Sequence, residues 1–474
     1  MLKKIIYSPF TKKIYDQVKD FPFLKNILVP LANSKSHHYL ENTKKKLNKI
    51  SPSMCSAKWL QSTIHLELAE THSCHHPKRH RIDTVEVAKN PSALHNTKEK
   101  IEFRTQMING DYPSECEYCW RVEKNGDYSD RIYKSSADWA QVNLSQLASL
   151  NKIENINPSY LEVSFSSDCN LKCAYCDPTV SSAIRHEIQK LGPYPTSDRF
   201  GNLDEYQPSP NDLSAAFWQW WDGGLKDDLK VLRVTGGEPL LSPDLFKLIE
   251  RLEYSDQKFQ FDFAVNSNLM VGPELIKKFI TNIRSILKNK KIKSFLLYTS
   301  IDTWGEQAEF LRYGLKTKQF INNIETCLNV IPDLELTFMV TYQALSPFNF
   351  NQLLEFILDL RKRYPISKIK IGISNMINPS FLSVSLFDQS FLPYIENNLN
   401  FMKSHQLTKN YPHGFSNFEI QHLERIQHSF KHHPQHPKEE MDNFKKFISE
   451  YEMRKKLNFK EVFKNADDFL KTIN

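Results

Sequence analysis

Three cysteines stand close together in the sequence, Cys169, Cys173 and Cys176, with the spacing C-x3-C-x2-C. Thiolates bind zinc and iron–sulfur clusters, but structural zinc takes four ligands and a standard cluster is held by four cysteines. Three thiolates therefore fit a cubane cluster in which one iron stays open to a small molecule that binds through an amine and a carboxylate. The alternatives are a zinc site completed by a distant residue and three unrelated cysteines.

Four further cysteines form a second group nearer the start of the chain: Cys55, Cys74, Cys116 and Cys119. Four thiols are enough for a closed tetrahedral zinc site or for a cubane cluster, and the residues alone do not choose between the two. Cysteines grouped in this way indicate reduced, metal-binding thiols rather than a disulfide framework. The eighth cysteine, Cys327, lies in an apolar helical run and is predicted to be a core thiol.

The first three cysteines lie between a predicted strand and a predicted helix. Residues 160–165 alternate and are rich in strand formers, whereas residues 181–191 have a helical pattern. Open α/β sheets bind ligands at such strand-to-helix turns. From residue 160 onward strands alternate with amphipathic helices, which predicts an α/β fold with a parallel sheet. The predicted strands cover residues 161–165, 231–234, 261–266, 295–301, 336–341 and 369–374.

The cysteine motif, read as C-x3-C-x-aromatic-C over Cys169, Cys173, Tyr175 and Cys176, resembles the signature of the radical S-adenosylmethionine (SAM) superfamily. The resemblance implies a [4Fe-4S] cluster on the three cysteines, with SAM chelating the open iron. It implies one-electron cleavage of SAM to methionine and a 5′-deoxyadenosyl radical that abstracts a hydrogen atom from the substrate. The six β–α units fit the family's partial (β/α)6 barrel, whose site lies at the C-terminal ends of the strands.

A second motif ends the second predicted strand. Gly236, Gly237, Glu238 and Pro239 match the family's G-G-E-P sequence, and two glycines let a backbone approach a ligand closely. The resemblance implies that Glu238 and the exposed carbonyl groups of this turn accept hydrogen bonds from the methionine ammonium of SAM. Tyr175, the aromatic residue of the cysteine motif, is expected to contact the same cofactor.

Polar residues end the next two predicted strands and would face the same mouth of the barrel. Asn266, Ser267 and Asn268 suit the ribose hydroxyls or the carboxylate of SAM. Ser300 and Asp302 match the family's S-I-D segment, and Ser300 is the better candidate for a SAM contact. Asp302 is expected either to bind ribose or substrate, or to cap the following helix.

Glu306, Arg312 and Gly314 match the family's E-x5-R-x-G segment. Arg312 is expected to pair with the SAM carboxylate, because a guanidinium group matches a carboxylate bidentately. The alternative is a surface ion pair between Glu306 and Arg312. Asn375, beyond the sixth predicted strand, is expected to contact adenine or substrate.

The second cysteine group also resembles part of this superfamily. Some members carry a twitch domain, a β-hairpin and a helix around an auxiliary iron–sulfur cluster, and in one family this domain precedes the barrel. The likeness rests on Cys55, Trp59, Cys74, Phe103, Arg104, Met107, Gly110, Pro113, Cys116 and Cys119. It implies an α+β domain in which the four cysteines hold an auxiliary [4Fe-4S] cluster. The predicted hairpin turn, residues 69–72, lacks the glycine common in relatives, and His75 replaces a second cysteine, which leaves open whether His75 is a ligand.

Four regions are expected along the chain: an N-terminal arm (1–50), a twitch-like domain (51–150), the partial barrel (151–380) and a helical closure (381–474). The net charge of +7 is spread over 474 residues and is weak evidence for nucleic acid. No stretch approaches the roughly 18–20 apolar residues of a membrane span, and the charged start does not resemble a secretory signal. We therefore expect a cytoplasmic protein with no membrane contact.

These features predict a radical SAM enzyme that modifies a peptide or protein side chain, because twitch-type relatives often do so. One alternative keeps the chemistry and gives it a small-molecule, sugar or nucleotide substrate. Another is a zinc-stabilised binding protein. The expected partners are SAM, an electron donor such as flavodoxin or ferredoxin, and a peptide or protein substrate.

Overall fold

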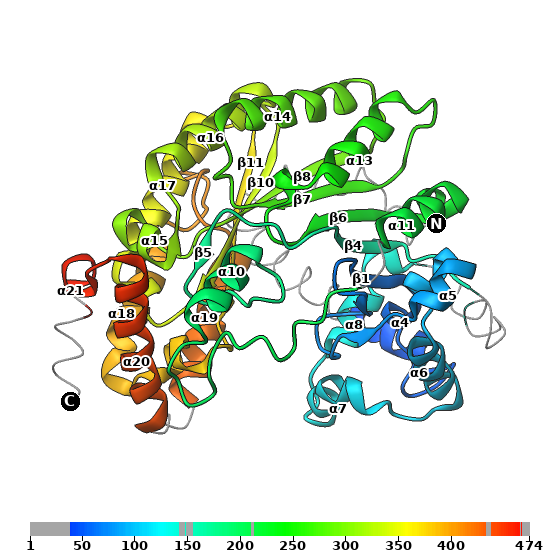
Figure 1. Ribbon diagram of the computed structural model, residues 1–474, viewed down its shortest axis with the longest axis horizontal. Helices are drawn as coiled ribbons and strands as arrows, with labels where there is room; N and C mark the ends of the chain where they lie inside the picture. The colour runs from blue at the N-terminus through cyan, green and yellow to red at the C-terminus, as the bar shows by residue number, and fades with distance from the viewer. Residues whose placement is uncertain are drawn as a thin grey trace.

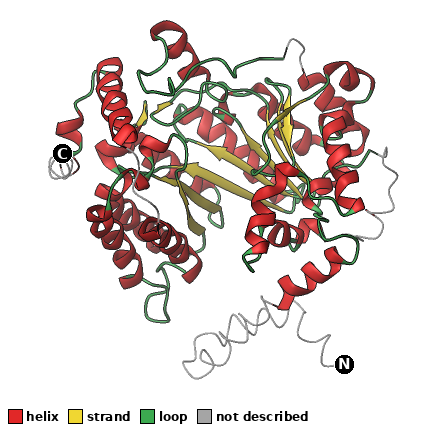
Figure 2. Ribbon diagram, turned by 90° about the horizontal axis from the view of Figure 1, so that it is seen from below, coloured by secondary structure: helices red, strands yellow, loops and turns green. Residues whose placement is uncertain are grey.

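A computed structural model describes residues 38–141, 147, 155–209, 213–432, 438–464 and 466. Most of the predicted N-terminal arm and the predicted boundary at residue 150 lie outside these residues. The centre of the molecule is a nine-stranded sheet with the order β11-β10-β8-β7-β6-β4-β1-β2-β3. Helices surround this sheet (Figure 2).

Six parallel strands form the larger part of the sheet, which confirms the predicted α/β fold. They follow one another in sequence order and pair with parallel register. Their bounds are β4 Tyr160–Ser164, β6 Val231–Thr235, β7 Asp262–Ser267, β8 Ser294–Ser300, β10 Glu335–Tyr342 and β11 Lys368–Asn375. Because the strands are parallel, their carboxyl ends meet at one edge of the sheet, where the predicted site residues lie.

Helices connect these strands and cover the sheet along its length (Figure 1). Their bounds are α10 Ser182–Leu191, α11 Leu213–Trp220, α12 Lys226–Asp228, α13 Pro243–Tyr254, α14 Pro273–Lys288, α15 Gly305–Leu311, α16 Thr317–Val330 and α17 Phe350–Arg363. Each long helix buries one apolar stripe, as Ile276, Phe279, Ile280 and Ile283 do in α14. Burial of such a stripe against the sheet is the main stabilising term for helices of this kind. Cys327 is fully buried in α16, as predicted.

The N-terminal region joins the same sheet. Strand β1 (Gln61–His65) pairs in parallel with β4, with Gln61 opposite Tyr160 and His65 opposite Ser164. Strand β2 (Glu70–His72) then pairs antiparallel with β1, and β3 (His80–Arg81) continues the sheet. The predicted turn at residues 69–72 is therefore wrong, because residues 70–72 form β2 and the connection covers residues 66–69.

Short helices of the N-terminal region gather beside β1 (Figure 1). They are α4 Ala57–Leu60, α5 Thr84–Lys89, α6 Lys98–Asn109, α7 Glu117–Lys124 and α8 Asp130–Ser135. These elements enclose a separate small core that includes Leu47, Met54, Trp59, Met107 and Ile132. The region therefore has its own packing although its first strand belongs to the central sheet.

The C-terminal helices lie at the opposite end of the molecule from the N-terminal region (Figure 1). They are α18 Leu392–Ser404, α19 Asn417–His432, α20 Lys438–Lys455 and α21 Phe459–Val462. Helix α19 covers the edge strand β11, where Ile371 N–H donates to Glu419 (3.0 Å) and Ile373 N–H donates to His422 (3.1 Å). These bonds satisfy backbone donors that an edge strand would otherwise expose. In the part of the chain that the structure describes, no helix has both the length and the apolar character needed to cross a bilayer.

Glu419 connects α19 to the sheet through the buried Arg361, which also donates to the carbonyl of Gly414 at 2.8 Å. We expect Glu419→Ala to lower the free energy of unfolding by about 3 kcal/mol, because it leaves a buried guanidinium unpaired. The measurement is the midpoint of anaerobic urea unfolding. The control is Glu335→Ala, which removes a carboxylate paired with the exposed Lys368 and Lys370 and should cost less than about 1 kcal/mol. Equal effects of the two substitutions would contradict this account.

Candidate functional site

The three cysteines of the first group lie on the loop between β4 and α10. Cys173 is buried, and Cys169 and Cys176 are partly buried. Burial raises the pKa of Cys173 to about 11, and it also raises the pKa of Cys176, to which the neighbouring thiols of Cys173 and Cys169 add. Three thiols that disfavour each other's ionised form need a bound cation to become thiolates, which are the form that ligates metal. This donor set fits an iron–sulfur cluster.

The glycine turn at residues 236–237 lies directly against the start of the cysteine loop. Gly237 N–H donates to the carbonyl of Ser166 at 3.2 Å, and Glu238 N–H donates to the carbonyl of Asp168 at 2.6 Å. A Cβ atom on Gly237 would stand 2.3 Å from the carbonyl oxygen of Asp168, and one on Gly236 would stand 2.5 Å from that of Ser166. Only glycine allows this approach. Pro239 follows at the start of the 3-10 turn Pro239–Leu241.

Glu238 is buried and organises the loop after β7. Its carboxylate accepts hydrogen bonds from Ser267 Oγ (2.7 Å), Asn268 N–H (2.6 Å) and Leu240 N–H (3.0 Å). Burial nevertheless raises the pKa of Glu238 to about 7. The side chain therefore holds two strand ends together, and its bond to the methionine ammonium of SAM stays a prediction.

The polar residues at the end of β7 have partners on both sides. Asn266 Oδ1 accepts from Arg233 Nε at 3.0 Å. Asn268 donates through Nδ2 to Asn170 Oδ1 at 2.9 Å, and Asn170 belongs to the cysteine loop. The end of β7 is thus tied both to β6 and to the cysteine loop, as a common site at the strand ends requires.

Arg312 lies beside Cys173 rather than on the surface. Strand β9 (Arg312–Tyr313) pairs antiparallel with β5 (Lys172–Cys173), so that Arg312 is opposite Cys173. The guanidinium donates to both carboxylate oxygens of Asp302, at 2.9 and 3.1 Å, and lies 3.7 Å from Cys173 Sγ. The alternative of a surface pair with Glu306 is therefore wrong. The pairing of Arg312 with the SAM carboxylate stays a prediction.

Asp302 is fully buried and joins three parts of the site. Besides Arg312, it accepts from Tyr175 Oη at 2.8 Å and from Thr341 N–H at 3.0 Å. It does not cap the following helix, because α15 begins at Gly305 after Trp304. The sequence missed this Tyr175–Asp302–Arg312 group because its members are far apart in the chain.

The backbone conformation and close packing at position 314 account for the glycine of the E-x5-R-x-G segment. Its φ is +104°, and a Cβ atom there would lie 2.9 Å from the side chain of Leu171. Nearby, Ala174 N–H donates to the carbonyl of Leu311 at 2.8 Å. The segment therefore packs its backbone directly against the cysteine loop.

Two predicted site residues end strands of the sheet. Ser300 is the last residue of β8 and is partly buried. Asn375 is the last residue of β11 rather than a residue beyond it, which corrects the prediction. Its Oδ1 atom is buried and has no hydrogen-bond partner within the described residues. A buried acceptor without a partner is unusual, and it fits a donor on a bound ligand.

The second group of cysteines meets in the N-terminal region. Cys55, Cys74, Cys116 and Cys119 line one cavity, although they come from three separate segments. Burial raises the pKa of Cys116 to about 12 and that of Cys119 to about 11. As in the first group, the thiolates would need a cation, and four of them fit a closed site.

The histidines next to Cys74 differ in their positions. His76 lines the cysteine cavity, and its Nε2 lies 2.9 Å from Asp130. His75 is largely exposed, and its Nε2 lies 3.2 Å from the same carboxylate. The described contacts of His75 are therefore with Asp130 and His76.

Buried basic side chains lie in and near the wall of the four-cysteine cavity. Lys58 and Arg131 line it and pair with Glu115 and Glu123. Lys100 is fully buried and donates to the neutral Ser62 (3.0 Å) and Thr71 (2.8 Å), and desolvation together with the nearby Arg104 and Lys58 lowers its pKa well below the ordinary value. Buried charges need compensation. An anionic metal–thiolate group in the cavity would provide it.

Arg104 belongs to the same cationic surroundings. It is buried, and it donates to Asn96 Oδ1 (2.8 Å) and to the carbonyl of Lys58 (3.1 Å). Desolvation lowers the pKa of Arg104 to about 9, because the charged guanidinium is buried without a carboxylate partner. A negative charge nearby would remove part of that cost.

The close approach of residues 236–237 can be tested by adding one methyl group. We expect Gly237→Ala to displace the cysteine loop, because the new Cβ would overlap the carbonyl groups of Ser167 and Asp168. Iron bound per chain after anaerobic reconstitution should fall by about four atoms, the content of one [4Fe-4S] cluster. The control is Gly223→Ala, which meets no atom within 4 Å and should leave the iron content unchanged. Full iron loading of the Gly237 variant would show that the close approach of Gly237 to the cysteine loop is not needed for iron binding.

A sequence model of the Radical SAM superfamily matches residues 163–357. GTP 3′,8-cyclase of Campylobacter jejuni is 27% identical over 201 residues, which are 42% of this chain and 51% of the relative. GTP 3′,8-cyclase of Helicobacter pylori is 26% identical over 165 residues, 34% of this chain and 45% of the relative. The chain thus spans about half the length of these curated relatives.

Solved structures give two further likenesses. The anSMEcpe structure with bound AdoMet aligns with a TM-score of 0.31 and 14% identity, covering 54% of this chain and 64% of that one. Streptococcus suis SuiB bound to S-adenosylmethionine aligns with a TM-score of 0.34 and 15% identity, covering 69% and 65%. The family match over residues 163–357 includes the cysteine loop, the glycine turn and the ends of β7 and β8, whereas Asn375 at the end of β11 lies outside it. Residues 163–357 therefore form a domain of the radical SAM superfamily.

Proposed function

We propose that this enzyme cleaves SAM reductively and uses the resulting radical to modify a peptide or protein side chain. The observation that carries the proposal is the placement of Cys169, Cys173 and Cys176 on one loop at the strand ends, against the turn formed by residues 236–238. When bound, a [4Fe-4S] cluster supplies the electron that splits SAM into methionine and a 5′-deoxyadenosyl radical, which takes a hydrogen atom from the substrate. The three cysteines would hold this cluster and leave one iron open to SAM.

The remaining residues at the strand ends would bind and orient SAM. The carbonyl groups at residues 236–238 suit its ammonium, and Asn266, Ser300 and the unpartnered Oδ1 of Asn375 suit hydroxyl or amino donors. Arg312 offers a positive charge beside Cys173, with its orientation fixed by Asp302. A side chain held by a second residue loses little conformational entropy when it binds its ligand.

We further propose that the N-terminal region is a twitch-type domain with an auxiliary [4Fe-4S] cluster on Cys55, Cys74, Cys116 and Cys119. The convergence of these four thiols on one cavity and the buried cations around it support this proposal. The cluster would relay electrons or position the substrate, because β1 connects its domain directly to the first barrel strand. Flavodoxin or ferredoxin is the proposed electron donor, and the cytoplasm is the proposed compartment.

A nucleotide substrate is the second candidate, because the curated relatives are named GTP 3′,8-cyclase. Isotope transfer separates the two candidates: the reconstituted enzyme is incubated with SAM and deuterated GTP or with deuterated peptides. Deuterium in 5′-deoxyadenosine identifies the substrate class that donates the hydrogen atom. Iron and sulfide analysis tests the third reading, a zinc-stabilised binding protein, which predicts zinc alone.

Replacing Cys169, Cys173 and Cys176 together with alanine should abolish 5′-deoxyadenosine formation from SAM and dithionite, because the open-iron cluster would lose all its ligands. The product is quantified by liquid chromatography after anaerobic reconstitution. Cys327→Ala is the control, since this thiol lies in the core away from both groups, and it should keep the activity. SAM cleavage by the triple variant would disprove the assignment.

Cys116→Ala should remove the auxiliary cluster and lower the iron content from about eight to about four atoms per chain. SAM cleavage without substrate should persist, whereas substrate turnover should fall if the cluster relays electrons or positions substrate. Electron paramagnetic resonance (EPR) of the reduced protein distinguishes the two clusters. Unchanged turnover after loss of the iron would assign the auxiliary cluster a purely structural role, and an unchanged iron content would refute the site itself.

A further inference from the structure

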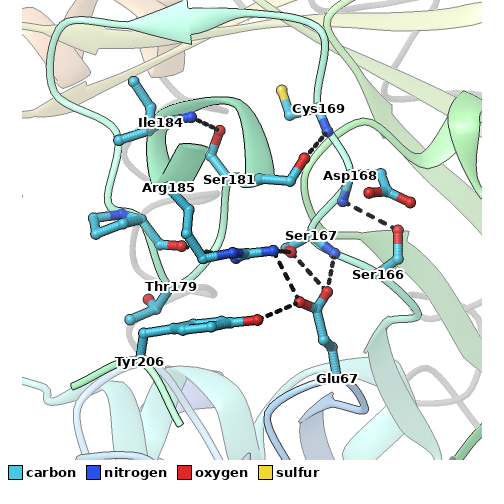
Figure 3. Close-up of polar contacts among 12 residues, drawn as sticks. Glu67, Ser166, Ser167, Asp168, Cys169, Thr179, Ser181, Ile184, Arg185 and Tyr206 are labelled. Carbon is cyan, nitrogen blue, oxygen red and sulfur yellow. Dashed lines mark hydrogen bonds and ion pairs between the residues drawn. The ribbon is translucent and has the colours of Figure 1, made fainter. Parts of the chain in front are cut away.

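Glu67 lies on the connection between β1 and β2, far in sequence from the cysteine loop that it contacts (Figure 3). One carboxylate oxygen accepts from both the N–H (2.7 Å) and the Oγ (2.6 Å) of Ser167. Ser167 is two residues before Cys169. A half-buried carboxylate of the N-terminal hairpin therefore binds the backbone at the start of the loop that carries the first cysteine group.

The second oxygen of Glu67 pairs with Arg185 of α10 at 3.1 Å. Arg185 is almost completely buried, and it also donates to Ser167 Oγ (2.9 Å) and to the carbonyl of Pro178 (2.9 Å). Ser167 precedes the three cysteines and Pro178 follows them. The Glu67–Arg185 pair thus closes the base of the cysteine loop by holding both of its ends.

Tyr206 covers this ion pair. Its ring lies 4.2 Å from the guanidinium carbon of Arg185, and its hydroxyl donates to Glu67 at 3.2 Å. Although burial alone would raise the pKa of Glu67, the hydrogen bonds from Ser167, with Arg185 and Tyr206, hold it below its ordinary value. The carboxylate is therefore ionised at neutral pH, and its bonds are charge-assisted and strong.

Ser167, which Glu67 and Arg185 hold in place, contacts two other parts of the site. Its carbonyl accepts from Ser182 N–H at 2.8 Å, and Ser182 Oγ accepts from Cys169 N–H at 3.2 Å. The same carbonyl would lie 2.4 Å from a Cβ on Gly237, so the glycine turn rests directly on it. A displacement of Ser167 would consequently move both Cys169 and the turn that is proposed to bind SAM.

We propose that Glu67 is a positioning residue: it closes the base of the cysteine loop and makes the geometry of the SAM-cluster site depend on the N-terminal hairpin. The hairpin continues through β2 to Cys74, so one short element connects both cysteine groups. The effect of Glu67 on SAM binding rests on the proposed function. Its effect on the geometry of the cysteine loop depends only on contacts within this chain.

The first test uses hydrogen–deuterium exchange on the full-length, metal-free protein. Glu67→Gln keeps the size of the side chain but removes its charge, and we expect amides of residues 166–169 to exchange about tenfold faster, because a charge-assisted hydrogen bond is weakened. Peptides from α6 and from α14 should exchange as in the wild type. The control is Glu70→Gln on the same hairpin, whose carboxylate pairs with Arg79 and Arg81 instead, and it should leave residues 166–169 unchanged.

Two outcomes would overturn the proposal: unchanged exchange at residues 166–169 in the Glu67 variant, or equal acceleration throughout the molecule, which would mean general destabilisation. Because no cofactor is present, this test stands even if the proposed function fails. Absence of iron and of SAM cleavage in the reconstituted wild type would instead refute the proposed function alone.

The second test uses the reconstituted protein. Glu67→Gln should bind the same amount of iron, but the SAM-induced change in the EPR spectrum of the reduced cluster should need about tenfold more SAM, because the loop and the glycine turn are no longer held in register. Glu67→Asp keeps the charge and should recover part of the affinity, whereas Glu70→Gln should titrate as the wild type does. Identical SAM titrations for Glu67→Gln and the wild type would show that the contact has no effect on the site.

Discussion

The cysteine loop has only the two-residue strand β5 as regular structure of its own, so its geometry depends on backbone contact with segments that come from elsewhere. Gly236 and Gly237 lie against its start and Gly314 against its middle, and each of them occupies a place where a Cβ atom would overlap. Such close approach lets peptide groups of the loops that follow neighbouring strands hydrogen bond directly, as Glu238 N–H does with Asp168. The positions of the three cysteines are therefore set by backbone contacts with these neighbouring segments.

Charge is arranged differently around the two cysteine groups. At the first group, Arg312 is the cation beside Cys173, and Asp302 neutralises and orients it. At the second group, Arg104 is buried with neutral partners, and Lys100 is buried beside it with a pKa that desolvation holds well below its ordinary value. Because burying an uncompensated charge is costly, the second site has a stronger electrostatic demand for an anionic group. A cation near a cluster favours its reduced form, so these side chains would raise the reduction potential of the clusters proposed for the two sites.

The parallel pairing of β1 with β4 gives the molecule its long-range organisation. It makes the N-terminal hairpin the continuation of the central parallel sheet, and it brings Glu67 to the end of β4 where the cysteine loop begins. A hairpin held by a ladder of backbone hydrogen bonds is a rigid support, more so than a flexible linker between domains would be. The two cysteine groups are thus connected through a single sheet.

The sequence by itself determined the features that depend on local spacing: the cysteine motif, the glycine turn at residues 236–237 and the alternation of strands and helices, because period and spacing are properties of neighbouring residues. It also indicated that the four N-terminal cysteines form one group, and in the folded chain these four residues line one cavity. Only the tertiary structure decided which charges meet. Asp302 pairs with Arg312 instead of capping a helix, Glu238 holds the loop after β7, and Glu67 reaches Ser167. Such partners are separated by many residues, and the packing of the sheet, not the local pattern, sets the distances between them.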